Sequence, residues 1–264
     1  MSRIGRILVL AGLLLAAAGV RADYSERADV RAYVAQLVAE HGFAADELME
    51  LFAQGERKQN ILDAIARPAE RVLKWHEYRE IFLGEPRISQ GVEFWNEHEE
   101  VLAEAERVFG VAAEYVVAII GVETRYGRVM GSHRVLDALL TLGFDYPPRA
   151  DFFRRELTQF LLLTREEGRN PVELMGSYAG AMGYGQFISS SYRAYAVDFD
   201  GDGLRDIWAN THDAIGSVAN YFARHGWRAG EPVVLPAQWR GDGDDGIATQ
   251  NLELRHTVAD LAAL

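Results

Sequence analysis

The stretch VVAIIGVETRYG, residues 116–127, ends an uncharged run at a carboxylate. Residues 116–122 carry no charge, and Glu123 is followed two positions later by Arg125. A carboxyl group among apolar side chains is hard to ionise, so its pKa rises and it can hold a proton near neutral pH. A general acid needs that property. On this stretch alone, a structural glutamate that caps the helix or pairs with Arg125 is the favoured alternative.

The first 22 residues have the order of a secretory signal. MSRIGR carries two arginines, ILVLAGLLLAAAG is a short apolar core, and VRA ends in a small residue. This order predicts a signal peptide over residues 1–22 and a soluble periplasmic protein, with no membrane anchor in the mature form. A single anchoring helix is the alternative, but the apolar run is short for a membrane span.

Composition excludes several classes of function. The chain has 264 residues, of which 49% are hydrophobic and 25% charged, as in ordinary globular proteins. It has no cysteine, which excludes disulfides, a thiol nucleophile and a lipid anchor on a cysteine. The formal charge is −12, and it becomes −15 without residues 1–22 and their three arginines. So acidic a protein is expected to repel nucleic acid.

Apolar residues at helical spacing dominate the chain. In SERADVRAYVAQLVAEHGF, Ser25 is the expected N-cap of a helix and Gly42 its stop. GVEFWNEHEEVLAEAERVFG predicts one long amphipathic helix that ends at Gly110. Strand patterns are scarce, and VVLP at 233–236 is the one short β-like run.

These patterns predict a mainly α (α+β) protein. We expect an N-terminal helical region over residues 23–110 and a helical core over 111–228, interrupted by glycine-rich connections. Residues 229–264 are rich in Pro, Gly and Asp, so they are expected to form an irregular or helical tail with a small β addition.

A glycine-rich stretch offers a candidate binding surface. GSYAGAMGYGQF, residues 176–187, combines four glycines with Ser177, Tyr184 and Gln186. Glycines let the backbone approach a ligand closely, and these polar and aromatic side chains suit sugar rings. The stretch lacks the Gly-Lys-Ser/Thr ending of a phosphate loop. Tight helix packing around small residues is an equally good interpretation.

DFDGDGLRDIW, residues 198–208, matches the start of a calcium-binding loop. Asp198, Asp200 and Asp202 alternate, glycine follows for the sharp turn, and Leu204 stands where a backbone carbonyl is used. The twelfth position holds alanine instead of a bidentate glutamate. A solvated acidic turn is the alternative, but three closely folded aspartates need a counter-ion. We therefore expect Ca²⁺ in a stabilising role, and no organic cofactor.

Five motifs occur in the order and spacing of one known family. GVETRYG, LLTLGFDYPPRADFFRREL, GSYAGAMGYGQF, AVDFDGDG and DAIGSVANYFARHGW resemble the family-103, B-type lytic murein transglycosylases. The resemblance implies a lysozyme-like core over residues 111–228 that cleaves peptidoglycan glycan strands. It implies a cut between N-acetylmuramic acid and N-acetylglucosamine that consumes no water and leaves a 1,6-anhydromuramoyl end.

Matched by motif, the resemblance gives Glu123 the place of the family's single catalytic acid and base. Ser177 and Gln186 fall where the family has polar groups beside the cleaved bond, and Tyr221 falls where it has an aromatic residue in the cleft. Arg149 matches one of two neighbouring arginines that meet the peptide stems, and a proline stands in the other place.

In the metal loop, the family has a later aspartate for which Asp213 is the stand-in. The resemblance also implies a mechanism with one carboxylate. Protonated Glu123 would donate to the leaving oxygen while the substrate's N-acetyl group stabilises the oxocarbenium-like centre. Ionised Glu123 would then take the proton of the sugar's C6 hydroxyl, which closes the ring.

Two alternatives stay open at this point. A hydrolytic muramidase would use the same cleft with water as the attacking group. A non-catalytic peptidoglycan-binding or scaffold protein would make Glu123 structural. Glycan strands are the expected partner, and the sequence leaves cell-wall synthesis proteins open. The chain ends at HTVADLAAL, where the family continues into a tyrosine-rich stretch, so the tail is expected to be incomplete relative to the family.

Overall fold

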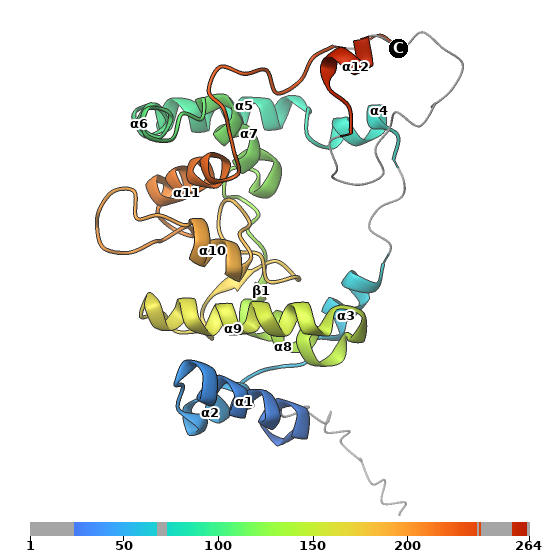
Figure 1. The fold of residues 1–264 in the computed structure, drawn as a ribbon, viewed down its shortest axis with the longest axis vertical. Coiled ribbons are helices and arrows are strands. Elements are labelled where there is room, and N and C mark those ends of the chain that lie inside the picture. Colours follow the sequence, from blue (N-terminus) through green and yellow to red (C-terminus); the bar gives the residue numbers. More distant parts are fainter. Residues whose placement is uncertain (1–23, 68–72, 237, 239–254, 263–264) are drawn as a thin grey trace, which may run out of the picture. The chain divides into compact units, whose positions relative to one another are not determined.

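A computed structural model describes residues 24–67, 73–236, 238 and 255–262 (Figure 1). The chain separates into two compact units, one that ends at Ala229 and one that begins at Gly230. The predicted signal peptide lies outside the described residues. Across those described ranges, no helix combines the length and the apolar character that crossing a membrane would require.

Helices make up nearly all of the regular structure, as the sequence predicted. In the first unit they are η1 (Tyr24–Glu26), α1 (Ala28–His41), α2 (Ala45–Ala53), α3 (Gln59–Ala66), α4 (Trp75–Tyr78), η2 (Arg79–Ile81), α5 (Glu85–Glu97), α6 (Glu99–Phe109), α7 (Ala113–Thr124), α8 (Val135–Asp145), η3 (Pro147–Arg149), α9 (Ala150–Glu166), α10 (Ser189–Tyr195) and α11 (Thr211–Arg224). The second unit contains α12 (Val258–Ala262).

The core of the first unit is built around α8. Residues 135–143 of this helix are all buried, and α9 packs along it. Leu136, Leu139 and Leu140 are among the largest fully buried side chains. Full burial of a leucine contributes about 1.5–3 kcal/mol relative to exposure, so α8 anchors the fold. Figure 1 shows α8 and α9 lying side by side below α10 and α11.

The start of α1 differs from the prediction. Its N-cap is Arg27, with extended backbone angles, whereas Ser25 lies in η1. Arg27 Nη1 donates to Asp145 Oδ1 at 2.7 Å, and Tyr24 donates its hydroxyl to the same carboxylate at 2.7 Å. This distant carboxylate fixes the chain before the helix, so the helix begins later than the local capping pattern indicates. Gly42 ends α1 in the left-handed conformation, as predicted.

The prediction of one long helix up to Gly110 is wrong, because the chain breaks at His98 into the two helices α5 and α6. His98 leaves the helical region at φ −117° and ψ 22°, and its ring packs on Phe94 with centroids 4.5 Å apart. The two halves have different partners: α5 packs on α7, and α6 packs mainly on α11. A continuous apolar periodicity cannot show such a change of partner. Gly110 does cap α6.

Strand structure is also placed differently from the prediction. VVLP at 233–236 forms no strand, and the side chains of Val233, Val234 and Leu235 are exposed. No ladder partner stabilises an extended run there among the described residues. The strands that the structure does describe are β1 (His133–Arg134) and β2 (Met175–Gly176), which pair antiparallel. The predicted mainly α class is confirmed.

Candidate active site

Glu123 lies in the last turn of α7, where the chain makes a left-handed exit. Arg125, Tyr126 and Gly127 have φ values of 53°, 59° and 78°. The Arg125 N–H donates to the carbonyl of Gly121, and the Tyr126 N–H donates to the carbonyl of Ile120, which satisfies the helix end. Non-glycine residues in this conformation are uncommon and carry a local energetic cost. The carboxylate therefore sits on a rigidly closed helix end.

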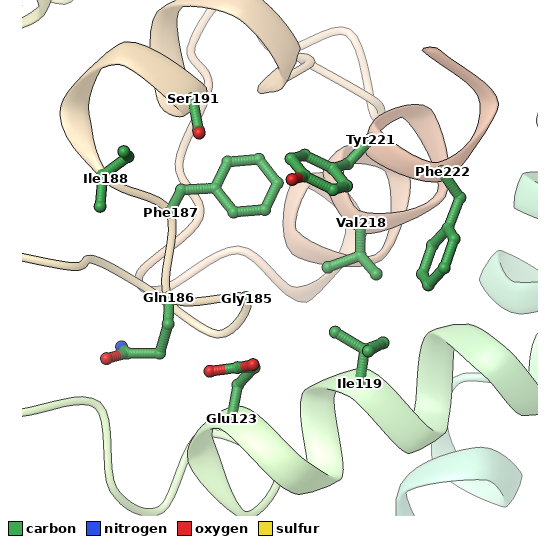
Figure 2. A pocket seen from close by; sticks show the side chains of 10 residues that line it. All are labelled: Ile119, Glu123, Gly185, Gln186, Phe187, Ile188, Ser191, Val218, Tyr221 and Phe222. Atoms are coloured by element: carbon green, nitrogen blue, oxygen red, sulfur yellow. The ribbon is translucent and has the colours of Figure 1, made fainter. Parts of the chain in front are cut away.

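The Glu123 side chain points into a pocket of about 250 Å³ (Figure 2). Apart from Glu123, the pocket is lined by Ile119, Gly185, Gln186, Phe187, Ile188, Ser191, Val218, Tyr221 and Phe222. Most of these residues are apolar, and Glu123 is the only carboxylate among these ten lining residues.

The environment of Glu123 raises its pKa. The side chain is accessible to solvent, yet neighbouring protein atoms remove enough water that desolvation holds the pKa of the carboxyl above its ordinary value. The pairing with Arg125 that the sequence left open does not form. Arg125 Nε instead donates to Gln90 Oε1 of α5 at 2.8 Å. The carboxylate can thus hold a proton that it is able to transfer.

Gln186 faces Glu123 from a tight hairpin. Met182 and Phe187 exchange both backbone hydrogen bonds at 2.9 Å, which closes the loop 183–186 between them. Gln186 adopts φ 50°, and its Nε2 donates to the carbonyls of Gly183 at 3.0 Å and Met130 at 3.3 Å. A non-glycine residue held in this conformation costs about 1–3 kcal/mol, and such strain is common at functional sites.

Glycines of the glycine-rich stretch lie close against other backbone atoms of the chain, which is the packing role that the sequence left open beside ligand binding. A methyl group at Gly176 would collide with the carbonyl oxygen of Ala181, and one at Gly183 would collide with that of Ile207. Gly183 also has φ 66°, which other residues rarely adopt. These positions let residues 176–187 fold back on themselves and present Gln186 to the pocket.

Tyr221 forms the opposite wall from α11. Its ring stacks on His225 at a centroid distance of 4.0 Å and meets Phe187 at 5.8 Å and Tyr195 at 5.1 Å. Tyr221 is 37% exposed, so part of the residue is available to a ligand. The structure therefore brings Glu123, Gln186 and Tyr221 into one pocket.

The other predicted substrate contacts lie outside this pocket. Ser177 Oγ accepts the N–H groups of Ala179 at 3.3 Å and Ala181 at 3.0 Å, so it shapes its own loop. Tyr184 lines a neighbouring pocket beside α5. Arg149 is exposed and lies over the ring of Phe152 at 4.3 Å.

Six pocket residues were not singled out from the sequence: Ile119, Phe187, Ile188, Ser191, Val218 and Phe222. The spacing of some of these residues from the predicted site residues could have identified them in the sequence. Ile119 precedes Glu123 by one helical turn, and Val218 and Phe222 flank Tyr221 on one face of α11. An apolar residue one turn from a candidate acid is thus a candidate wall of the site.

The aspartate loop brings three carboxylates together. Oxygen atoms of Asp198, Asp200 and Asp202 lie within 4.8 Å of one another, and all three side chains are exposed. Backbone N–H groups fix them: Asp198 Oδ2 accepts from Gly203 at 2.8 Å, and Asp202 Oδ1 accepts from Leu204 at 2.8 Å. A cluster of fixed, like-charged oxygens offers a hard cation its preferred ligands.

Asp213 lies apart from that cluster. It is fully buried, and its two oxygens accept the N–H groups of Phe199 and Asp206, each at 2.7 Å. Desolvation raises the pKa of the Asp213 carboxyl, and the charges of Asp200 and Asp198 add to the rise. Through these two hydrogen bonds, the buried carboxylate of Asp213 links Phe199, near the start of the loop, to Asp206, near its end.

Comparisons with known proteins identify the family of this chain. The family profile of the transglycosylase SLT domain matches residues 25–264. The membrane-bound lytic murein transglycosylase B of Escherichia coli is 43% identical over 251 residues, which cover 91% of this chain and 68% of that protein.

Two crystal structures share the fold. The soluble lytic transglycosylase SltB1 of Pseudomonas aeruginosa is 62% identical, with a TM-score of 0.76 over 77% of this chain and 69% of that one. The Escherichia coli lytic transglycosylase Slt35, solved in complex with calcium, is 43% identical, with a TM-score of 0.81 over 91% of this chain and 75% of that one.

The resemblance read from the five motifs is confirmed by these matches. The fold is lysozyme-like, and the non-catalytic alternative is set aside because the relatives are transglycosylases. Because the SLT domain profile matches residues 25–264 and a murein transglycosylase is 43% identical over 91% of this chain, the chain belongs to the B-type lytic murein transglycosylases, enzymes that act on peptidoglycan.

Proposed function

We propose that Glu123 is the single acid and base with which this enzyme cleaves the bond between N-acetylmuramic acid and N-acetylglucosamine. One observation carries the proposal: Glu123 is the only carboxylate among the residues that line the pocket. Glycosidases with two acids need the second carboxylate across the bond, about 5–9.5 Å away. With one carboxylate at hand, the same group must serve both steps.

In the first step, Glu123 donates its proton to the glycosidic oxygen as the bond to the muramic acid C1 breaks. Its raised pKa favours the protonated, proton-donating form more than an ordinary glutamate would. The positive charge that develops at C1 is stabilised by the substrate's own N-acetyl oxygen. Gln186 supports this arrangement, because its amide nitrogen is held by two backbone carbonyls and its amide oxygen is the acceptor it can offer to the substrate.

In the second step, ionised Glu123 takes the proton of the C6 hydroxyl of the same muramic acid. The C6 oxygen bonds to C1, the 1,6-anhydro ring closes, and Glu123 is again protonated. No water enters the balance. The apolar residues Ile119, Phe187 and Val218 favour this outcome, because they limit the space for a competing water beside C1. The partly exposed ring of Tyr221 is suited to stack on a sugar face.

The three remaining predicted contacts belong to the periphery of this proposal. Ser177 can still donate its hydroxyl proton to a sugar oxygen while it accepts two backbone N–H groups. Arg149, exposed beside α9, can meet a carboxylate of a stem peptide. Tyr184 acts from the neighbouring pocket.

The aspartate loop is proposed as a calcium site. Asp198, Asp200 and Asp202 would supply carboxylate oxygens and Leu204 its carbonyl, and these oxygen donors fit Ca²⁺. When bound, the ion would neutralise the clustered charge and stabilise the loop. Asp213 would support the loop from the protein interior, because its oxygens already accept two backbone N–H groups. The calcium complex of the relative Slt35 supports this proposal.

Export to the periplasm is proposed from the signal-like order of residues 1–22. One relative is named membrane-bound and another soluble, so the relatives span both modes of location. The murein substrate, which lies outside the cytoplasmic membrane, requires such an export.

Mass spectrometry of purified murein digested by the protein tests the proposal. The parent is expected to release products with 1,6-anhydromuramoyl ends, and Glu123→Gln is expected to reduce their release by about 10²- to 10⁴-fold. Glu114→Gln is the matched control, because Glu114 is an exposed glutamate in the first turn of the same helix. Products heavier by one water would indicate a hydrolytic muramidase, and release at the parent rate by Glu123→Gln would refute the assignment.

A further inference from the structure

Thr124, the residue after Glu123, is buried at the junction of three chain segments. Only 1% of its surface is exposed. Its Oγ1 donates to the carbonyl of Tyr184 at 2.9 Å and accepts the N–H of Gly127 at 3.1 Å. The carbonyl of Ile120, one turn earlier in α7, is a longer alternative acceptor at 3.2 Å. Because a hydroxyl donates one proton, the shorter bond across to Tyr184 is the principal one.

This bond joins the two walls of the active site. Thr124 is the neighbour of Glu123 in α7, and Tyr184 directly precedes Gly185 and Gln186, which line the pocket opposite. A second tie runs in the same direction, since Gln186 Nε2 donates to the carbonyl of Met130, just after the left-handed turn. The distance between the acid and the amide thus depends on two polar contacts across the segments.

Close contacts surround the left-handed turn. A methyl group at Gly127 would collide with the ring of Tyr184, and a methyl group at Gly121 would collide with the hydroxyl end of Tyr126. A methyl group at Gly91 of α5 would also collide with the hydroxyl end of Tyr126. Tyr126 is therefore seated between α5 and α7.

We propose that Thr124 is a positioning residue that sets the placement of Gln186 relative to Glu123 through its hydrogen bond to the Tyr184 carbonyl. The proposal rests on the role of Glu123 given above. Without the hydroxyl, the Tyr184 carbonyl and the Gly127 N–H lose their partner, and the hairpin can move away from α7. A displacement of about 1 Å at a catalytic group can cost about 100-fold in rate.

The test compares Thr124→Val, which keeps the shape and removes the hydroxyl, with Thr124→Ser, which keeps the hydroxyl. Thr164→Val is the matched control: Thr164 is equally buried, and its Oγ1 donates to the carbonyl of Leu161 within α9, away from the pocket. Release of anhydro products from soluble glycan strands gives kcat, KM and the pH profile, and thermal unfolding gives Tm.

We expect Thr124→Val to lower kcat by about 10- to 100-fold while Thr124→Ser stays within about threefold of the parent. The pH profile of Thr124→Val should keep the shape of the parent profile, because the Thr124 hydroxyl does not touch the Glu123 carboxylate. Thr164→Val should lose a similar amount of Tm without the loss of kcat. Parent-level kcat in Thr124→Val, or a loss in Thr124→Ser as large as in Thr124→Val, would overturn the proposal.

Glu123→Gln, assayed in the same series, separates this proposal from the one on which it rests. If Glu123→Gln were active at the parent rate, the proposed acid and base would be wrong. If Glu123→Gln were inactive and Thr124→Val fully active, only the positioning role of Thr124 would fail.

Discussion

The end of α7 and the aspartate loop use the same chemical group in opposite surroundings. Glu123 is one carboxylate beside mostly apolar side chains, and partial desolvation raises its pKa. Asp198, Asp200 and Asp202 are three carboxylates in the open, each fixed by backbone N–H groups. A carboxylate poor in partners keeps its proton and can exchange it. Carboxylates that are clustered and fixed by backbone donors can hold a cation.

The difference shows that environment assigns the roles, since all four groups are acids on an acidic chain. The aspartates repel one another unless a cation lies between them, and their cost falls on stability. Glu123 has no like-charged neighbour among the pocket residues, and its cost is desolvation. Variants that change the residues around a carboxylate, or replace the carboxylate itself, measure separately the cost of repulsion in the aspartate loop and the cost of desolvation at Glu123.

Calcium is expected to give the largest effect on stability. At a free concentration of about 100 times its Kd, the ion should stabilise the native state by about 2.7 kcal/mol, which for a unit of this size raises Tm by about 5–10 °C. Asp202→Asn should remove most of that shift and leave the rate of product release little changed. Calorimetry with calcium and with a chelator measures it. Asp46→Asn, an exposed aspartate in α2, should keep the full shift.

Asp213→Asn should give the next largest effect, and it should do so in calcium-free buffer. Both Asp213 oxygens accept backbone N–H groups inside the protein, and asparagine offers one oxygen in place of two. One buried donor loses its acceptor, which costs about 1–3 kcal/mol. Denaturant unfolding measures the loss. Asp200→Asn, at an exposed position of the same loop, should cost less; equal losses would contradict the scaffold role of Asp213.

The helices of this protein could be predicted from the sequence because their apolar spacing is regular and glycines mark several ends. Gly42 and Gly110 adopt the left-handed conformation that stops α1 and α6. The break at His98 could not be predicted, since it depends on which partners α5 and α6 meet. The two-residue strands β1 and β2 are too short to leave an alternating pattern.

The site was predictable where chemistry marks a residue and not where packing decides. Glu123 stands out because a charge ends an apolar run. Gln186 and Tyr184 are two residues apart in one hairpin, yet they line different pockets, and only the fold of that hairpin separates them. Val218 and Phe222 look like core residues of an amphipathic helix, and only the approach of the 185–188 segment turns them into a wall.

Ile119→Asn should shift the pH dependence by a fraction of a unit, up to about one unit. A polar side chain one turn before Glu123 lessens desolvation, so the pKa of the carboxyl falls toward its ordinary value. The acid form then disappears at lower pH, and the alkaline fall in kcat/KM moves down the pH scale. Val122→Asn, exposed on the same helix outside the pocket, should leave the midpoint in place. An upward shift in Ile119→Asn would contradict desolvation as the cause.

The smallest effect concerns the stability of Glu123→Gln. Because the folded state raises the pKa of this carboxyl, ionised Glu123 is less stable in the native protein than in the unfolded chain. The cost is fully present above the folded pKa and vanishes below the unfolded pKa of about 4.3. Glu123→Gln should therefore raise Tm slightly at neutral pH, and the gain should disappear near pH 4.

Glu114→Gln serves as the comparison for the direction of this change in Tm. Glu114 lies in the first turn of α7, where a negative charge interacts favourably with the helix dipole. Its loss should lower Tm slightly at neutral pH, so the two glutamine variants of one helix should move in opposite directions. If Glu123→Gln also lowered Tm at neutral pH, the carboxylate would be stabilising the native state. A group held in place for stability would then be a poor candidate for one that must gain and lose a proton in every turnover.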